Sequence, residues 1–255
     1  MKNIEVINLK EVLYRINVQQ DVPLEMTKKA FMEILEIKDT NLRNLFLGSF
    51  LTAYMARKPA VDEIVSLLEV AFSIDKYVPQ NRDKVVGIND KVVTIVGSGK
   101  KGVKTINIST ASAILAASMG VYVVKPGSAS TSSLTGSADF LEKLGANTFL
   151  STDQSIEILK KCNFTFFKIE NMIPKFDKLY NGNFYVPHTL SFGLAGLLCP
   201  VKTDVLLYGL AHPDVELSLN VLNKFGVENA MVYCSTDDGV HFIDEMGVYG
   251  YSRLI

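Results

Sequence analysis

A glycine-rich segment with three lysines, GSGKKGVKTINIST at positions 97–110, carries the strongest chemical signal in the sequence. Its glycines let the backbone turn tightly and present N–H groups to an anion, and the helix expected to begin near Ser109 would point its positive end there. The glycines are Gly97, Gly99 and Gly102, and the lysines are Lys100, Lys101 and Lys104. We predict a phosphate site, although a glycine turn with solvated lysines would give the same pattern. The spacing matches neither a Walker A loop nor a dinucleotide-binding fingerprint.

A second loop, KPGSASTSSLTGSAD from Lys125 to Asp139, combines seven hydroxyl-bearing residues with two glycines. Hydroxyl groups are costly to bury unless they meet hydrogen-bond partners, such as the phosphate or ribose oxygens of a ligand. The loop therefore favours ligand binding. The alternative is a solvated loop in which Ser137 caps the next helix.

Two acidic pairs follow the last predicted strand, Asp237-Asp238 and Asp244-Glu245. Mg²⁺ prefers one or two carboxylates together with water and substrate phosphates, so either pair has the chemistry to hold this ion. Solvated turns also contain such pairs. The three histidines, at positions 188, 212 and 241, form no cluster in the sequence and are expected to be structural or exposed.

The elements that must position these loops fall into two blocks. From Leu9 to about Phe72 apolar residues recur every three or four positions, which predicts three or four packed helices with a break at Pro59. A polar segment, 79–90, is the predicted linker. Beyond it β-branched runs alternate with helical patterns, which predicts an α/β domain with a mainly parallel sheet. The predicted strands are 91–96, 121–124, 163–169, 204–208 and 230–233, and the predicted helices are 111–117, 137–144, 155–161 and 215–225.

The composition argues against several classes of protein. The 255 residues include 26 Lys and Arg against 27 Asp and Glu, so the chain has no global basic field for nucleic acid. Its N-terminus lacks the apolar core of a signal peptide, and its apolar stretches are too short to cross a bilayer. The three widely spaced cysteines predict neither a disulfide framework nor a zinc site. We expect a cytoplasmic protein without a membrane or nucleic-acid partner.

The order of these motifs resembles the anthranilate phosphoribosyltransferase family and its relatives among the nucleoside phosphorylases. That family runs from a helical region through a strand, GTGGDG, NxST, KHGNRxxSSxxGSAD and a segment ending GPLLNP to a DE pair. This sequence has a helical block, TIVGSGKKG, NIST, KPGSASTSSLTGSAD, AGLLCP and Asp244-Glu245 in the same order. The resemblance implies a small helical domain at 1–78 and an α/β phosphoribosyl-binding domain at 91–255. It also implies a homodimer formed through the helices.

The resemblance further implies a reaction and roles for the matching residues. Phosphoribosyl pyrophosphate would lie between the domains, and a nucleophilic nitrogen of an acceptor would displace its Mg²⁺-bound pyrophosphate. Asp244 and Glu245 would bind the Mg²⁺. The pyrophosphate cradle would be Gly97, Ser98, Gly99 and Gly102. The other substrate-binding candidates are Lys100, Lys101, Lys104, Thr105, Asn107, Ser109, Thr110, Lys125, Gly127, Ser128, Ser132 and Ser137.

The departures from the family pattern bear on the acceptor. Lys100 and Lys101 replace the Gly-Asp of GTGGDG, and KPGS replaces KHGN, so the His and Asn that face the acceptor are gone. The family's carboxylate-binding Arg falls at about 182–183, where this chain has Gly and Asn, and its RTxFN segment reads HTLSF at 188–192. We therefore expect a phosphoribosyltransferase-like enzyme whose acceptor is not anthranilate.

Two alternatives remain open. One is a nucleoside phosphorylase-like enzyme, which would bind inorganic phosphate in the same loops and split a nucleoside into its base and a phosphorylated ribose. The other is a non-catalytic phosphate- or nucleotide-binding homologue. The sequence ends ten residues after Glu245, whereas the family continues. This predicts either a more open site or a wall supplied by a partner.

Overall fold

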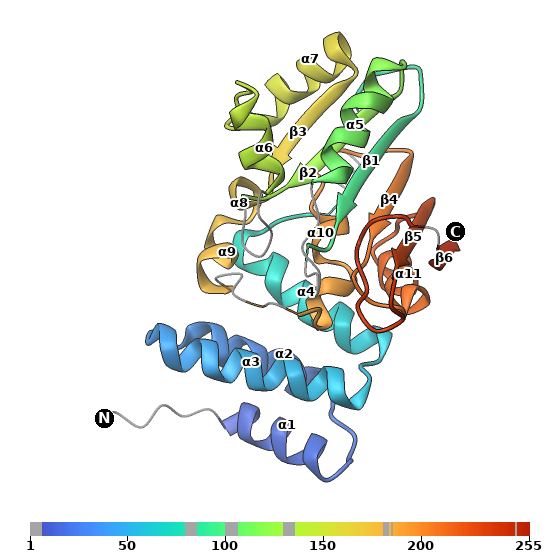
Figure 1. Cartoon of the computed structure of the whole chain (residues 1–255). Helices are drawn as coiled ribbons and strands as arrows, with labels where there is room; N and C mark the ends of the chain where they lie inside the picture. Colours follow the sequence, from blue (N-terminus) through green and yellow to red (C-terminus); the bar gives the residue numbers. More distant parts are fainter. Residues whose placement is uncertain are drawn as a thin grey trace.

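The computed structural model describes residues 7–79, 86–99, 107–129, 136–180, 184, 186–247 and 249–255. Its N-terminal part is a layer of four helices at one end of the molecule, α1 (Ile7–Asn17), α2 (Leu24–Glu36), α3 (Thr40–Arg57) and α4 (Val61–Asp75) (Figure 1). The predicted break at Pro59 is confirmed, since α3 ends and α4 begins on either side of it. The Asp39 side chain caps the N-terminus of α3 by accepting a 2.9 Å hydrogen bond from the Leu42 amide.

The remainder is built on a sheet with the strand order β3-β2-β1-β4-β5-β6. The first five strands in this order are parallel, and β6 pairs antiparallel with β5. The bounds are β1 Val92–Gly97, β2 Tyr122–Gly127, β3 Phe164–Lys168, β4 Val205–Gly209, β5 Ala230–Ser235 and β6 Gly250–Leu254. The predicted fold class, a helical domain followed by a mainly parallel α/β domain, is confirmed.

Helices cover both faces of the sheet because successive strand residues point to opposite sides. On β2, Val123 packs against the alanines of α5 (Ile108–Ser118), whereas Val124 lies in a cluster with Leu159 of α7 (Thr152–Cys162). Helix α6 (Ser137–Lys143) packs on Phe166 of β3, and α11 (Val215–Lys224) contacts β5 and β6. The predicted helices of this block are therefore all present.

Four short helices between β3 and β4 were not predicted: α8 (Ile169–Met172), α9 (Pro174–Tyr180), the 3-10 helix η1 (Thr189–Phe192) and α10 (Leu194–Leu197). They join the helical layer to the sheet. The Phe31 ring of α2 lies 6.5 Å from that of Phe176 on α9, and α4 contacts α9, η1 and α11. One apolar core consequently runs from α1 to the sheet, across the predicted boundary between 1–78 and 91–255.

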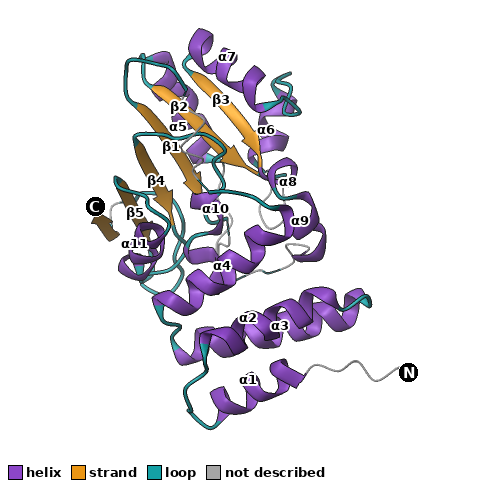
Figure 2. Cartoon of the chain, turned by 180° about the vertical axis from the view of Figure 1, so that it is seen from behind, coloured by secondary structure: helices purple, strands orange, loops and turns teal. Residues whose placement is uncertain are grey.

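The carboxyl ends of the parallel strands point toward the helical layer (Figure 2). The chain runs outward from β1 to β2 and β3 and then returns to the other side of β1 as β4. Open parallel sheets bind ligands at the carboxyl ends of the strands where the order reverses in this way, here between β1 and β4. Among the described residues, no helix is both long and apolar enough to span a bilayer.

Candidate phosphate-binding site

The glycine-rich segment begins where β1 ends against β4. Gly97 and Gly209 are register partners on these two strands, and the Asp244 segment packs directly on both. A Cβ atom at Gly97 would lie 2.2 Å from Asp244 Oδ2, and one at Gly209 would lie 2.0 Å from the Asp244 carbonyl oxygen. Glycine is needed at both strand ends because the acidic segment occupies the space that any side chain would take.

Hydrogen bonds hold the start of the loop in place. The Ser98 amide donates to the Gly209 carbonyl oxygen at 2.8 Å, and the Ala211 amide donates to Ser98 Oγ at 3.1 Å. Gly99, with a φ of +73° that favours glycine, donates its amide to Asp244 Oδ2 at 2.9 Å. The amide of Gly99, a residue of the predicted cradle, is therefore held by the Asp244 carboxylate, which joins the glycine turn to the acidic pair.

The Asp244-Glu245 pair reaches this place through a bridge to the end of β5. Ser235 and Ile243 exchange backbone hydrogen bonds of 3.1 and 2.9 Å, and Ser235 Oγ donates to the Glu245 carbonyl oxygen at 2.8 Å. Both acidic residues are buried, with 5% and 6% exposure. The structure therefore brings together the glycine-rich segment and the acidic pair, although Gly99 and Asp244 are 145 residues apart in the sequence.

Asp244 and Glu245 bring negative charge to the described part of this corner of the sheet. Burial, together with the charges of Asp244 and Glu245, raises the pKa of Tyr233 on β5 to about 12. Over the described ranges, no group of three or more His, Cys, Asp or Glu side chains has a metal-binding arrangement. A pair of carboxylates is nevertheless sufficient for Mg²⁺, which takes its other ligands from water and substrate phosphates. Asp244 and Glu245 therefore fit this ion in donor type.

The N-terminus of α5 lies beside that of α6. Asn107 caps α5 by accepting a 3.2 Å hydrogen bond from the Thr110 amide, and Ser109 lies in the first turn. Thr110 is fully buried, and its hydroxyl group donates to Ser137 Oγ at 3.1 Å. Residues from the first and second predicted loops thus meet at this point.

The second loop is fixed at both of its described ends. Lys125 lies within β2 and is only 1% exposed, so it belongs to the interior of the sheet. A Cβ at Gly127 would lie 2.8 Å from Ser137 Cβ, because β2 passes close to the start of α6. The Ala138 amide donates to the Ser128 carbonyl oxygen at 3.1 Å, which closes the base of the loop.

Glu170 is a further acidic residue at this edge, and the sequence analysis did not identify it. It follows β3 and accepts a 2.8 Å hydrogen bond from the Ala129 amide at Oε1. Burial is the main cause that raises its pKa above the ordinary value. In the sequence, the only indication of a functional role for Glu170 was its position directly after a predicted strand, and this position is not part of a recognised motif.

Several predicted site residues lie outside the described residues: Lys100, Lys101, Gly102, Lys104, Thr105 and Ser132, together with positions 182–183. The histidines occupy three separate places. His188 is buried and hydrogen-bonded to the Tyr180 hydroxyl group, and His241 pairs with Asp238 on an exposed turn. His212 packs its ring against Phe192 near the end of β4, and burial lowers its pKa.

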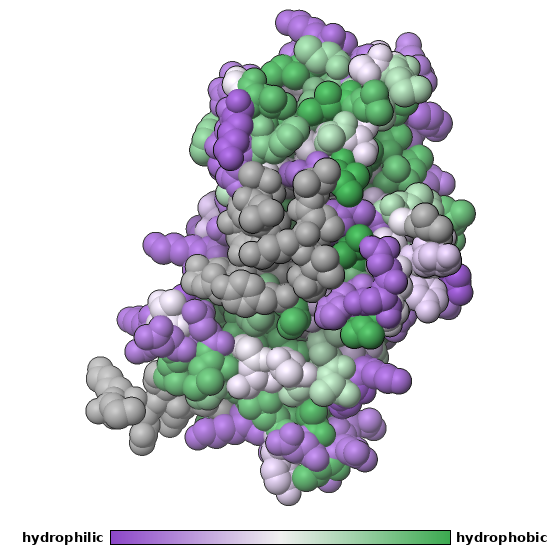
Figure 3. Space-filling view, in the orientation of Figure 1, coloured by the Kyte–Doolittle hydropathy of each residue, from purple (hydrophilic) through white to green (hydrophobic). Residues whose placement is uncertain are grey.

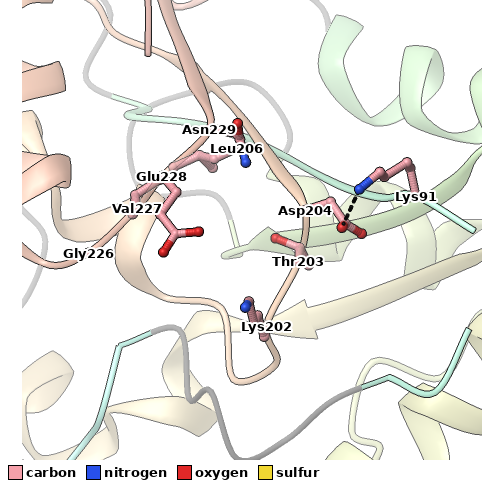
Figure 4. A pocket seen from close by; sticks show the side chains of 9 residues that line it. All are labelled: Lys91, Lys202, Thr203, Asp204, Leu206, Gly226, Val227, Glu228 and Asn229. Carbon is pink, nitrogen blue, oxygen red and sulfur yellow. Dashed lines mark hydrogen bonds and ion pairs between the residues drawn. The ribbon is translucent and has the colours of Figure 1, made fainter.

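A pocket of 240 Å³ lies at the opposite edge of the sheet, where the strands begin (Figure 4). Lys91 Nζ and Asp204 Oδ1 form a 3.1 Å ion pair there, and Asp204 Oδ2 accepts a hydrogen bond from the Val92 amide. Hydrogen bonding to Val92 and the charge of Lys91 lower the pKa of Asp204. This pocket is separated from the glycine loop by the length of the strands.

The comparisons with known proteins agree with this fold. The sequence profile described as "Glycosyl transferase family, a/b domain" matches residues 89–252. Anthranilate phosphoribosyltransferase of Ruminiclostridium cellulolyticum is 34% identical over 230 residues, covering 88% of this chain and 63% of the relative. The enzyme of Methanosphaerula palustris is 32% identical over 228 residues, covering 89% and 65%. The chain thus spans less than two thirds of the length of these curated relatives.

Solved structures with low sequence identity show the same fold. Anthranilate phosphoribosyltransferase from Thermus thermophilus superimposes with a TM-score of 0.67 at 21% identity, covering 94% of this chain and 72% of the other. The Saccharomyces cerevisiae enzyme, described as a complex with PRPP and Mg, gives 0.72 at 16% identity, covering 98% and 73%. The profile match, which spans more than half of the sequence, shows that the chain belongs to the glycosyl transferase family that includes the anthranilate phosphoribosyltransferases.

Proposed function

We propose that this protein transfers the phosphoribosyl group of phosphoribosyl pyrophosphate to an acceptor other than anthranilate. The observation that carries the proposal is the glycine turn after β1, which lies against the buried Asp244-Glu245 pair because the Gly99 amide donates to Asp244 Oδ2. A site for a pyrophosphate and a divalent cation needs these two features together. The family relationship and the PRPP and Mg named for the yeast neighbour support this assignment.

The residues of the chain have distinct tasks in this proposal. Gly97 leaves space at the strand end for Asp244, and the Gly99 amide holds the Asp244 carboxylate beside the turn. The first turn of α5 directs its amides and its positive end to the same edge, where the developing negative charge of the pyrophosphate is stabilised. Asp244 and Glu245 would hold Mg²⁺, which when bound supplies positive charge to the leaving pyrophosphate.

The acceptor side differs from that of the relatives at the residue level. The motif KPGS supplies no imidazole or amide side chain where the family has KHGN, and positions 182–183 supply no guanidinium group. A carboxylate acceptor therefore lacks a cationic partner at these positions, and anthranilate is a poor fit. The chemistry instead favours an acceptor whose nucleophile is a nitrogen and which carries no carboxylate.

A homodimer formed through the helical layer belongs to the same proposal. Ile7 and Tyr14 are seven residues apart on α1, hence on one face, and are 67% and 61% exposed. Leu45 of α3 is 62% exposed, and Figure 3 shows apolar residues at the surface of the helical layer, at the lower end of the view. Burial of this surface against a second copy would remove it from water. We place the protein in the cytoplasm.

The direct test measures binding and turnover separately. Calorimetric titration with phosphoribosyl pyrophosphate, with and without Mg²⁺, reports the substrate site, and release of pyrophosphate is then followed across aromatic amines, aromatic carboxylates and nucleobases. The proposal predicts Mg²⁺-dependent binding and turnover with a nitrogen acceptor other than anthranilate. Cleavage of a nucleoside by inorganic phosphate would instead indicate a phosphorylase. Binding without turnover across the whole panel would indicate a non-catalytic homologue.

A further inference from the structure

Glu170 is an acidic group at the proposed substrate edge that the roles assigned so far do not explain. It lies directly after β3, at the carboxyl end of the parallel sheet, and its neighbour across the strand pair is the start of the hydroxyl-rich loop after β2. Ligands of open parallel sheets bind along this edge. The residue as a whole is partly buried, whereas its Oε2 atom is shielded from solvent.

The two carboxylate oxygens of Glu170 have different surroundings. Oε1 accepts the 2.8 Å hydrogen bond from the Ala129 amide, which fixes the side chain against the β2 loop. Oε2 is shielded from solvent, and it has no hydrogen-bond partner within the part of the chain that the structure describes. A buried carboxylate oxygen without a donor is unfavourable, and such groups in native proteins call for an explanation.

The surrounding charges do not neutralise Glu170. Burial raises its pKa, and the negative charge of Asp177 acts in the same direction. Lys168 is the nearby cation, but its ammonium group pairs with Glu142 at 3.2 Å and lies 4.3 Å from the centre of the Phe149 ring. A hydrogen-bond donor brought by a ligand would therefore supply what the described residues leave out.

We propose that Glu170 Oε2 is a specificity-determining group that accepts a hydrogen bond from an N–H of the acceptor molecule. An acceptor with a neutral or cationic nitrogen group satisfies this oxygen, whereas an acceptor with a carboxylate at the same place meets like charge. Glu170 thus selects nitrogen-rich acceptors and rejects carboxylates. This inference rests on the proposed phosphoribosyl transfer, because it assigns the second substrate of that reaction.

Two probes of nearly equal shape test whether the acceptor site prefers an N–H donor to a carboxylate. Anthranilate carries a carboxylate, and 2-aminobenzamide carries an amide with N–H donors in its place. Each is titrated into the protein saturated with phosphoribosyl pyrophosphate and Mg²⁺. We expect the protein to bind 2-aminobenzamide at least about tenfold more tightly than anthranilate, since hydrogen bonds to charged groups are the strong ones.

Substitutions then assign the preference to Glu170. In Glu170→Gln the amide oxygen still accepts from Ala129 while an NH₂ donor replaces Oε2, so the preference for 2-aminobenzamide should disappear or reverse. The matched control is Glu157→Gln on the exposed face of α7, where the side chain pairs with Lys160, and it should keep the preference. Glu170→Ala removes both contacts and should also weaken the binding of phosphoribosyl pyrophosphate through the loosened loop.

The outcomes distinguish this inference from the proposed function. If the unmodified protein fails to bind phosphoribosyl pyrophosphate, the proposed function fails. If that substrate binds but the two probes bind equally, or neither binds, the Glu170 inference is wrong. It is also wrong if Glu170→Gln keeps the preference of the unmodified protein, because Glu170 then only positions the loop.

Discussion

Replacement of Gly97 by alanine tests the contact between the glycine loop and the acidic pair. The added Cβ would lie 2.2 Å from Asp244 Oδ2 and 3.0 Å from its Cγ. Ordinary contacts are about 3.5–4.0 Å, so the carboxylate must retreat by more than about 1 Å. That movement breaks the hydrogen bond from the Gly99 amide, which is 2.9 Å long. Overpacking costs about 1–3 kcal/mol and a hydrogen bond to a charged group contributes about 1.5–3 kcal/mol, so we expect about 2.5–6 kcal/mol of lost stability.

The assay is urea unfolding of Gly97→Ala beside a matched control, Gly48→Ala. Gly48 lies within α3, and a Cβ there meets no atom within 4 Å. Alanine is the better helix former, so the control should gain about 0.5–1 kcal/mol. Gly97→Ala should also lose Mg²⁺-dependent binding of phosphoribosyl pyrophosphate. An unfolding midpoint equal to that of the unmodified protein, with binding intact, would refute the packing of Asp244 on the strand end.

Three further predictions concern other parts of the molecule. Asp39→Ala removes the side-chain cap of α3 and should lower the free energy of unfolding by about 1 kcal/mol in urea titration, and an unchanged midpoint would contradict this role. Lys91→Ala breaks the ion pair in the pocket at the opposite edge of the sheet and should leave the affinity for phosphoribosyl pyrophosphate unchanged by calorimetry, whereas a large loss would move the substrate site there. Burial raises the pKa of Glu170 above its ordinary 4.5, so its ionisation removes stability as the pH rises through that raised value. Glu170→Gln should therefore gain stability relative to the unmodified protein between about pH 4.5 and neutrality, and the opposite slope in urea titrations at several pH values would contradict the burial argument.

The fold was largely predictable because its main elements carry strong periodic signals. The predicted strand 91–96 is followed by Gly97, and the structure places β1 at Val92–Gly97. The predicted helix 111–117 is found as α5, and Gly120, with a φ of +96°, follows two residues after its end, where glycine commonly terminates a helix. Local backbone preferences thus determined where these elements begin and end.

Other elements could not be predicted, for identifiable physical reasons. The short helices between β3 and β4 contain four to seven residues, too few for a helical period to be recognised. Strand β6 is an edge strand with every residue exposed, so it lacks the alternation of polar and apolar residues that marks a half-buried strand. Tertiary contacts, and not local sequence, define these segments.

In the candidate site, too, some features could be predicted from local sequence and others depend on tertiary contacts. Gly97, Asn107 and the Asp244-Glu245 pair were recognisable because their types and order form motifs. The approach of Asp244 to Gly97 and Gly209 depends on the bridge between Ser235 and Ile243, which no local pattern encodes. Glu170 was missed because a single acidic residue after a strand has many structural uses.

A crystal structure of the protein with phosphoribosyl pyrophosphate and Mg²⁺ would be the most direct test of the central claim. We predict electron density for the pyrophosphate beside the turn at Gly97–Gly99 and against the start of α5, with the cation beside Asp244 and Glu245. Pyrophosphate density at the far edge of the sheet, between Lys91 and Lys202, with none beside the glycine turn, would contradict it.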